Sequence, residues 1–299
     1  MDAISIPDHL WVRKDSGFVA PDWDGIAREV QARIGEAERG AAWSEVARQW
    51  LQRIRGRLGS PYSLRESANF FLLAVADERK AAEVLSFLEE CLRGIRSALF
   101  FAADEPLIGK IPVLVFADID LFYVYLSDYV EEEGEYGGVG GVYLNRGYGH
   151  FAVQSLDFSG YIDVLSHELC HAILAPRELP LWLDEAITGT VEHDITGRNP
   201  YVLDREIVQR HRSYWTRERL RKFWSGESFW LPDEGQELSY HLARFVLNGL
   251  WRGGVTPAAD MKEFVRRAKR DDAGFAAAQE VFDVDLEDVV GEFLFGSNE

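Results

Sequence analysis

Residues 165–174, which read LSHELCHAIL, are the most informative stretch of this sequence for its fold. Apolar residues recur at helical spacing through Leu165, Leu169 and Ile173, which predicts an amphipathic helix with one buried side. Pro176 follows shortly afterwards and predicts the end of that helix, because proline cannot continue the hydrogen-bonded backbone. The polar residues of the stretch then fall on the remaining part of the helix surface.

Three of those polar residues form a pattern that suits metal chemistry. His167 and His171 are one turn apart on the same face, so two imidazoles can bind one ion. Glu168 is rotated by about 100° from His167, close enough to reach a metal-bound water without displacing it. Zinc lowers the pKa of such a water to about 7, and a carboxylate can pass its proton to a leaving amine. We therefore expect two zinc ligands and a general base, with chance occurrence as the competing explanation.

A third ligand is expected on a second helix, within residues 179–189, which read LPLWLDEAITG. Pro180 suits the first turn of a helix. Glu185 would complete a site of two histidines and one glutamate with a position left for water, the pattern of catalytic zinc. Asp184 is the alternative ligand, and Glu185 is favoured because its longer side chain reaches further from a neighbouring helix.

With these residues assembled, the chain resembles the gluzincin metallopeptidases, and most closely the bacterial peptidase MA-like group. In that group a Trp-Leu-x-Glu-Gly segment follows the zinc helix after a short linker, and residues 182–186 here read WLDEA. Ala186 replaces the usual glycine. The resemblance extends more weakly over roughly residues 61–295 and implies an α+β fold with a thermolysin-like core. A small twisted sheet would pack on the zinc-binding helix and be followed by a mostly helical subdomain.

The resemblance also implies roles outside the zinc helix. Tyr240 would donate a hydrogen bond to the oxyanion of the tetrahedral intermediate, with His241 as the alternative donor. A buried tyrosine in a helix contact explains Tyr240 equally well. One of the strands expected at residues 142–145 and 151–154 resembles the edge that binds an extended peptide by strand addition. The alternative for each of these two strands is an ordinary strand of the sheet with no role in binding.

The chain divides into three regions by its patterning. Residues 1–60 form an N-terminal helical segment, residues 61–158 the β-rich half of the catalytic domain, and residues 159–299 the helical half. Residues 1–60 lie outside the resemblance, and are expected to pack onto the domain or to lie across the cleft as a latency segment. The periodicity predicts helices after Pro21-Asp22 and around 43–54, 78–99, 240–251, 258–268, 275–282 and 286–295, strands at 68–76, 111–117, 142–145 and 151–154, and a loop at 131–141.

Composition excludes several classes of protein. The chain has 32 Lys and Arg against 50 Asp and Glu, a net charge of −18, which repels phosphate backbones, so nucleic acid is not an expected partner. Two cysteines, no visible secretory signal and short apolar runs predict a cytoplasmic protein that does not enter a membrane. The other histidines have no partner at ligand spacing and are expected to be surface or packing residues, namely His9, His150, His193 and His211.

Together these observations predict a zinc-dependent metallopeptidase that acts on a peptide or protein substrate. Two alternatives remain open from the sequence. One is a non-catalytic peptide-binding protein on the same scaffold, and the other is a zinc hydrolase that acts on a non-peptide substrate. Glu168 argues against the first, because a scaffold that only binds metal has no need of a carboxylate beside the open position.

Overall fold

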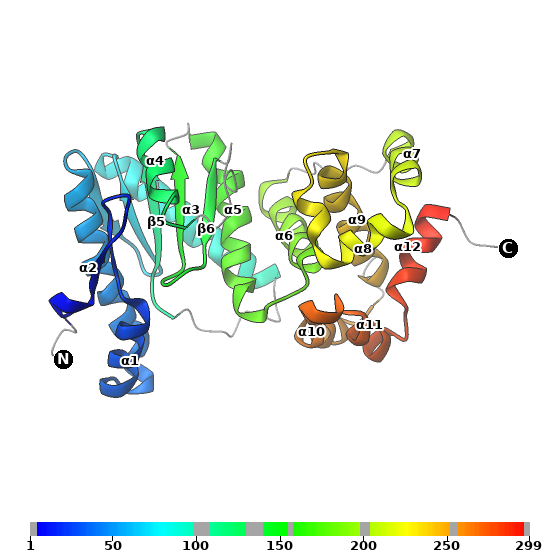
Figure 1. Ribbon diagram of the computed structural model, residues 1–299, viewed down its shortest axis with the longest axis horizontal. Helices are drawn as coiled ribbons and strands as arrows, with labels where there is room; N and C mark the ends of the chain where they lie inside the picture. The colour runs from blue at the N-terminus through cyan, green and yellow to red at the C-terminus, as the bar shows by residue number, and fades with distance from the viewer. Residues whose placement is uncertain are drawn as a thin grey trace. The chain divides into compact units, whose positions relative to one another are not determined.

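The computed structural model describes residues 5–98, 108–129, 140–154, 158–197, 204–251 and 256–295 (Figure 1). The chain forms two compact units, one of residues 1–97 and 103–172 and the other of residues 98–102 and 173–299. The first unit contains the described strands, and the second is helical where it is described. The predicted α+β class with a small sheet and a high helix content is therefore confirmed. Most of the loop predicted at 131–141 lies outside the described residues.

The N-terminal part of the first unit begins with a short hairpin, β1 (Trp11–Arg13) paired antiparallel with β2 (Val19–Pro21). Two helices follow, α1 (Trp23–Arg33) and α2 (Arg39–Leu58), as the periodicity of residues 1–60 predicts. Asp22 begins α1 by accepting a hydrogen bond from the N–H of Gly25 at 3.1 Å, which satisfies a backbone group that the first helical turn leaves open.

A five-stranded mixed sheet forms the centre of this unit, in the order β3-β4-β5-β7-β6. The three central strands run parallel to one another, and each outer strand pairs antiparallel with its neighbour. Every residue of β4 is buried, which is typical of a parallel strand covered on both faces. The bounds are β3 (Ser63–Glu66), β4 (Phe70–Ala74), β5 (Ile111–Phe116), β6 (Gly141–Leu144) and β7 (His150–Gln154). The predicted buried strands and the predicted hairpin are confirmed.

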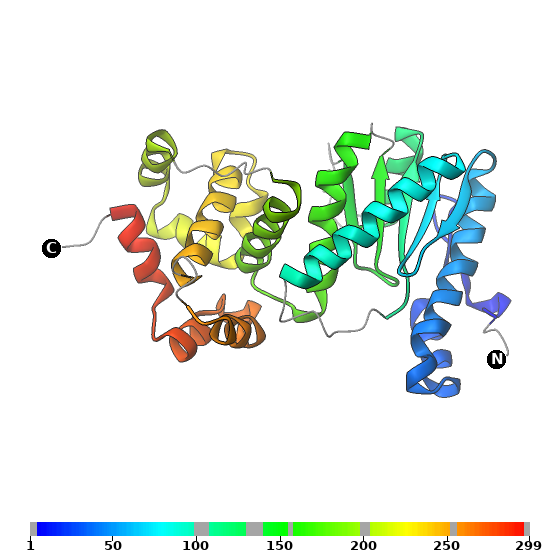
Figure 2. The same ribbon diagram turned by 180° about the vertical axis from the view of Figure 1, so that it is seen from behind.

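Helices cover both faces of the sheet (Figures 1 and 2). On one face, α2 and α4 (Ile119–Leu126) pack against alternate strand residues such as Phe71 and Leu114, forming one apolar cluster. On the other face lie α3 (Glu78–Ala98) and α5 (Phe158–Leu174) (Figure 2). The strand side chains that point to this second face, Phe70 and Val113 among them, are buried as well. The sheet thus packs against the helix predicted to bind metal.

The second unit contains helices α6 to α12, and α6 packs along α9. The last two helices begin and end at the predicted residues, whereas α9 begins earlier than the predicted start at Tyr240. The bounds are α6 (Leu181–Thr196), α7 (Arg205–Tyr214), α8 (Arg217–Ser225), α9 (Glu234–Trp251), α10 (Ala258–Arg267), α11 (Phe275–Phe282) and α12 (Leu286–Phe295). Among the described helices, none combines the length and the apolar character needed to cross a membrane.

Candidate metal centre

Helix α5 is oriented by its apolar side. Leu165, Leu169 and Cys170 are each at most 1% exposed, which anchors this side of the helix in the core. His167 and His171 are only partly buried, so their rings remain accessible to an ion. Burial of the apolar side therefore determines which way the polar residues point, as the 3.6-residue period predicts. Cys170 is an ordinary small core residue.

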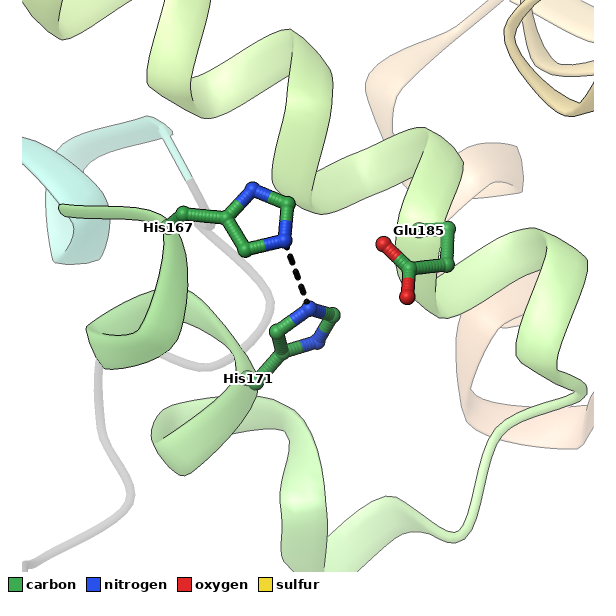
Figure 3. A group of neighbouring side chains, drawn as sticks. All are labelled: His167, His171 and Glu185. Atoms are coloured by element: carbon green, nitrogen blue, oxygen red, sulfur yellow. Dashed lines mark hydrogen bonds between the residues drawn. The ribbon is translucent and has the colours of Figure 1, made fainter. Parts of the chain in front are cut away.

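The two histidines converge at one point. Their Nε2 atoms lie 3.0 Å apart, and the ring centroids are 4.7 Å apart with the rings inclined at 77° (Figure 3). Two nitrogen ligands at about 2.0–2.1 Å from a tetrahedral zinc are themselves about 3.3 Å apart. The imidazoles are thus already arranged close to the geometry that a shared ion requires.

Glu185 completes a group of three ligand side chains. One ligand atom from each of His167, His171 and Glu185 lies within 4.8 Å of the others, and this is the one such group among the residues that the structure describes. The Oε2 atom of Glu185 is buried. Two imidazole nitrogens and one carboxylate oxygen are a donor set that suits zinc and leaves a coordination position open for water. Asp184, the alternative ligand, is not part of this group; its Oδ1 faces the hydroxyl of Thr188 at 3.5 Å.

The start of α6 sets the position of Glu185 along that helix. Pro180 stands at the N-cap, where its missing N–H leaves no donor unsatisfied. Trp182 and Leu183 are fully buried, and the indole N–H of Trp182 donates to the carbonyl of Ala273 at 2.9 Å. These contacts anchor the first turn of α6 within the second unit.

Glu168, the predicted general base, is held by the edge of the sheet. The backbone N–H of Tyr143 in β6 donates to Oε2 of Glu168 at 2.9 Å. The strand register explains this bond. The N–H of Gln154 donates to the carbonyl of Gly140, and in an antiparallel pair hydrogen-bonded and non-hydrogen-bonded residue pairs alternate along the strands. Tyr143, opposite Phe151, is therefore in a non-hydrogen-bonded pair, and its backbone N–H and C=O point away from β7. Sequence reasoning missed this link, because periodicity places a strand but does not reveal which outside side chain its free N–H meets.

Tyr143 itself is packed into the sheet. Its ring lies 5.1 Å from the ring of Phe151, centroid to centroid, and burial raises the pKa of its phenol to about 12. The phenol is therefore neutral at physiological pH.

The structure places Tyr240 in α9, where its ring packs edge-on against Phe229 with centroids 5.2 Å apart. His241 is 6% exposed, and its ring lies 6.0 Å from the ring of His211. Burial lowers the pKa of His241. Neither residue belongs to the group of three ligand side chains. The oxyanion role therefore stays a prediction for both.

Comparison of the chain with protein-family models, curated proteins and solved structures finds no match. The resemblance to the gluzincins therefore rests on residues 167–171 and 182–186. The functional argument rests on the donor chemistry of His167, His171 and Glu185 and on the position of Glu168 beside the histidines.

Proposed function

We propose that this protein is a zinc-dependent metallopeptidase. His167, His171 and Glu185 would bind the zinc, and Glu168 would serve as general base. The observation that carries the proposal is the meeting of two imidazoles and a carboxylate within 4.8 Å, with a second carboxylate on the neighbouring helical position. Three protein ligands and an open position are the pattern of catalytic rather than structural zinc.

The chemistry follows from these groups. When bound, zinc supplies a Lewis acid and lowers the pKa of a coordinated water to about 7. Glu168 accepts a proton from the attacking water and delivers it to the nitrogen of the scissile bond, which leaves as an amine while the other product is a carboxylic acid. The Tyr143 N–H binds one oxygen of Glu168, and this bond orients the other oxygen for proton transfer.

The presence of Glu168 favours catalysis over metal binding alone. A site that only holds zinc has no need of a carboxylate beside the open coordination position. The peptide-binding and non-peptide hydrolase alternatives are separated from the proposal by a cleavage experiment.

Glu168→Gln should strongly reduce cleavage and leave the metal in place. The amide keeps the size of the side chain but cannot accept the proton, so turnover should fall by about 10²–10⁴-fold. The measurement is mass-spectrometric detection of cleavage in a mixed library of unstructured peptides, with zinc content determined by elemental analysis. Glu90→Gln, an exposed position on α3, is the matched control and should cleave like the parent.

The outcomes separate the candidate functions. Cleavage by the parent and by Glu90→Gln, but not by Glu168→Gln, supports the peptidase proposal and also reports the specificity. If the zinc-loaded parent cuts no peptide, the peptidase proposal fails. Zinc at one equivalent in both proteins would then leave a binding protein or a hydrolase of non-peptide substrates.

A further inference from the structure

The second unit carries a groove that the proposed metal centre does not use. Residues of α9, α10, α11 and α12 and the turn between α11 and α12 surround a volume of about 740 Å³. The rings of Phe245 from α9 and Phe293 from α12 stack there, with centroids 3.9 Å apart. Phe245, Phe282, Val289 and Phe293 are each only partly buried, so apolar side chains form part of the solvent-facing surface of the groove.

Within the described ranges, the charged side chains that border these apolar residues are all carboxylates. Among the residues that the structure describes, those that line the groove include no Lys, Arg or His. Two arginines of α10 form ion pairs with glutamates that do not line the groove, Arg266 with Glu263 and Arg267 with Glu263 and Glu280. The carboxylates that line the groove are Asp260, Asp283, Asp285, Asp288 and Glu292. Within the described part of the chain, no ion pair neutralises any of these five.

We propose that this groove binds a basic amphipathic helix of a partner protein. The apolar side chains of such a helix, spaced at every third or fourth residue, would fill the space between Phe245, Phe282 and Val289. Its lysines and arginines would face the carboxylates along the border, where complementary charge gives specificity and fast association.

The charge of the border decides among the possible occupants. A second copy of this chain would bring its own carboxylates, and its net charge of −18, against the same border. Anionic lipid and nucleic acid would be repelled in the same way. A cationic segment is attracted both by the five local carboxylates and by the charge of the whole molecule.

The test uses a fluorescent synthetic helix with leucines on one face and lysines on the other, and a counterpart in which glutamate replaces lysine. The full chain carries Glu168→Gln throughout, so the peptide is not cut and failure here is separate from failure of the peptidase proposal. Asp288→Asn/Glu292→Gln neutralises two exposed carboxylates one turn apart on α12. We expect its Kd for the lysine peptide to rise about fivefold, as two ion pairs at a partly exposed border would give.

Asp271→Asn/Glu287→Gln is the matched control, since both residues are exposed, neither lines the groove, and Glu287 lies on the same helix. Its Kd should equal that of the parent.

Hydrogen exchange should show protection in α9, in α12 and at 281–284 when the peptide binds. The proposal is overturned by absent binding at low salt, by equal binding of the glutamate peptide, by equal weakening in the control, or by protection confined to other elements. Concentration-dependent dimerisation that Asp288→Asn/Glu292→Gln removes would assign the groove to a second copy instead.

Discussion

At the scale of single residues, His150 is the centre of a buried polar chain in the first unit. It is fully buried, and its Nδ1–H donates to the carbonyl of Tyr148 at 2.7 Å. Its Nε2 then accepts from the hydroxyl of Tyr125 at 2.6 Å, and that hydroxyl lies 3.1 Å from the hydroxyl of Tyr129. Burial lowers the pKa of His150 to about 4, so the ring is neutral in the folded state. It is a packing histidine, as the sequence predicts.

The lowered pKa predicts a loss of stability in weak acid. Between pH 6.5, the ordinary histidine pKa, and about pH 4, His150 is protonated in the unfolded chain but stays neutral in the folded protein. The free energy of unfolding should therefore keep its full value above pH 6.5 and fall by roughly 3 kcal/mol as the pH is lowered from 6.5 to about 4. His211, whose pKa burial also lowers to about 4, acts in the same direction.

Urea unfolding with excess chelator, from about pH 7.5 to about pH 4.5, measures this dependence without a contribution from metal. His150→Asn should be less stable at neutral pH but show a shallower fall. His9→Gln, at an exposed position, should keep the full slope of the parent. Equal slopes in the parent and in His150→Asn would contradict the assignment.

The identity of the third ligand is also a question of single residues. Glu185→Gln should weaken zinc binding more than the 10–100-fold that loss of an outer-shell partner costs, because it removes a direct ligand. Asp184→Asn, at the adjacent position, should bind zinc like the parent, since Asp184 is outside the ligand group. Competition with a chromophoric chelator measures both affinities. The reverse ranking of the two variants would make Asp184 the ligand.

At the scale of elements, α2 is part of the core of the first unit. Trp50, Leu51 and Ile54 are each at most 1% exposed and belong to the apolar cluster on the sheet. The ring of Trp50 packs edge-on against Trp23 and His150, at 5.2 Å and 4.9 Å between centroids. Deletion of residues 1–60 would uncover this face of the sheet, so we expect an insoluble protein rather than the activation that a removable latency segment would give.

Trp50→Ala tests this role without a deletion. Truncation of a fully buried tryptophan leaves a large cavity and should cost about 3–5 kcal/mol of unfolding free energy. Gln52→Ala, two residues along the same helix and exposed, should change stability by less than about 0.5 kcal/mol. Urea midpoints of the two variants give the comparison. A loss below about 1 kcal/mol for Trp50→Ala would mean that α2 is not integral to the core.

At the scale of the whole molecule, the net charge of −18 should act on substrate choice. A negative surface raises the local concentration of cationic peptides and lowers that of anionic ones. If the peptidase proposal holds, kcat/KM for a lysine-rich peptide should fall several-fold between low and physiological ionic strength, as the Debye length shortens to about 8 Å. A neutral peptide of the same length should show no such change. Equal salt dependence of both peptides would contradict electrostatic steering.

The helices and buried strands could be predicted because their signals are local. The spacing of Leu165, Leu169 and Ile173 places His167 and His171 on one face of α5, whatever else the chain does. Likewise, continuous apolar runs predict β4 and β5, and the two C-terminal helices match their predicted bounds. Periodicity therefore sufficed for element type and for the two imidazoles of the candidate site.

The contacts between distant segments could not be predicted in this way. The sequence by itself determined the pair of imidazoles, the adjacent Glu168 and the acidic charge, because these depend only on residue type and helical period. Only the tertiary structure decided that Tyr143 N–H binds Glu168, that His150 is enclosed by Tyr125 and that acidic α12 borders an apolar groove. The physical reason is that such contacts depend on strand register and helix packing, which burial of the whole core selects.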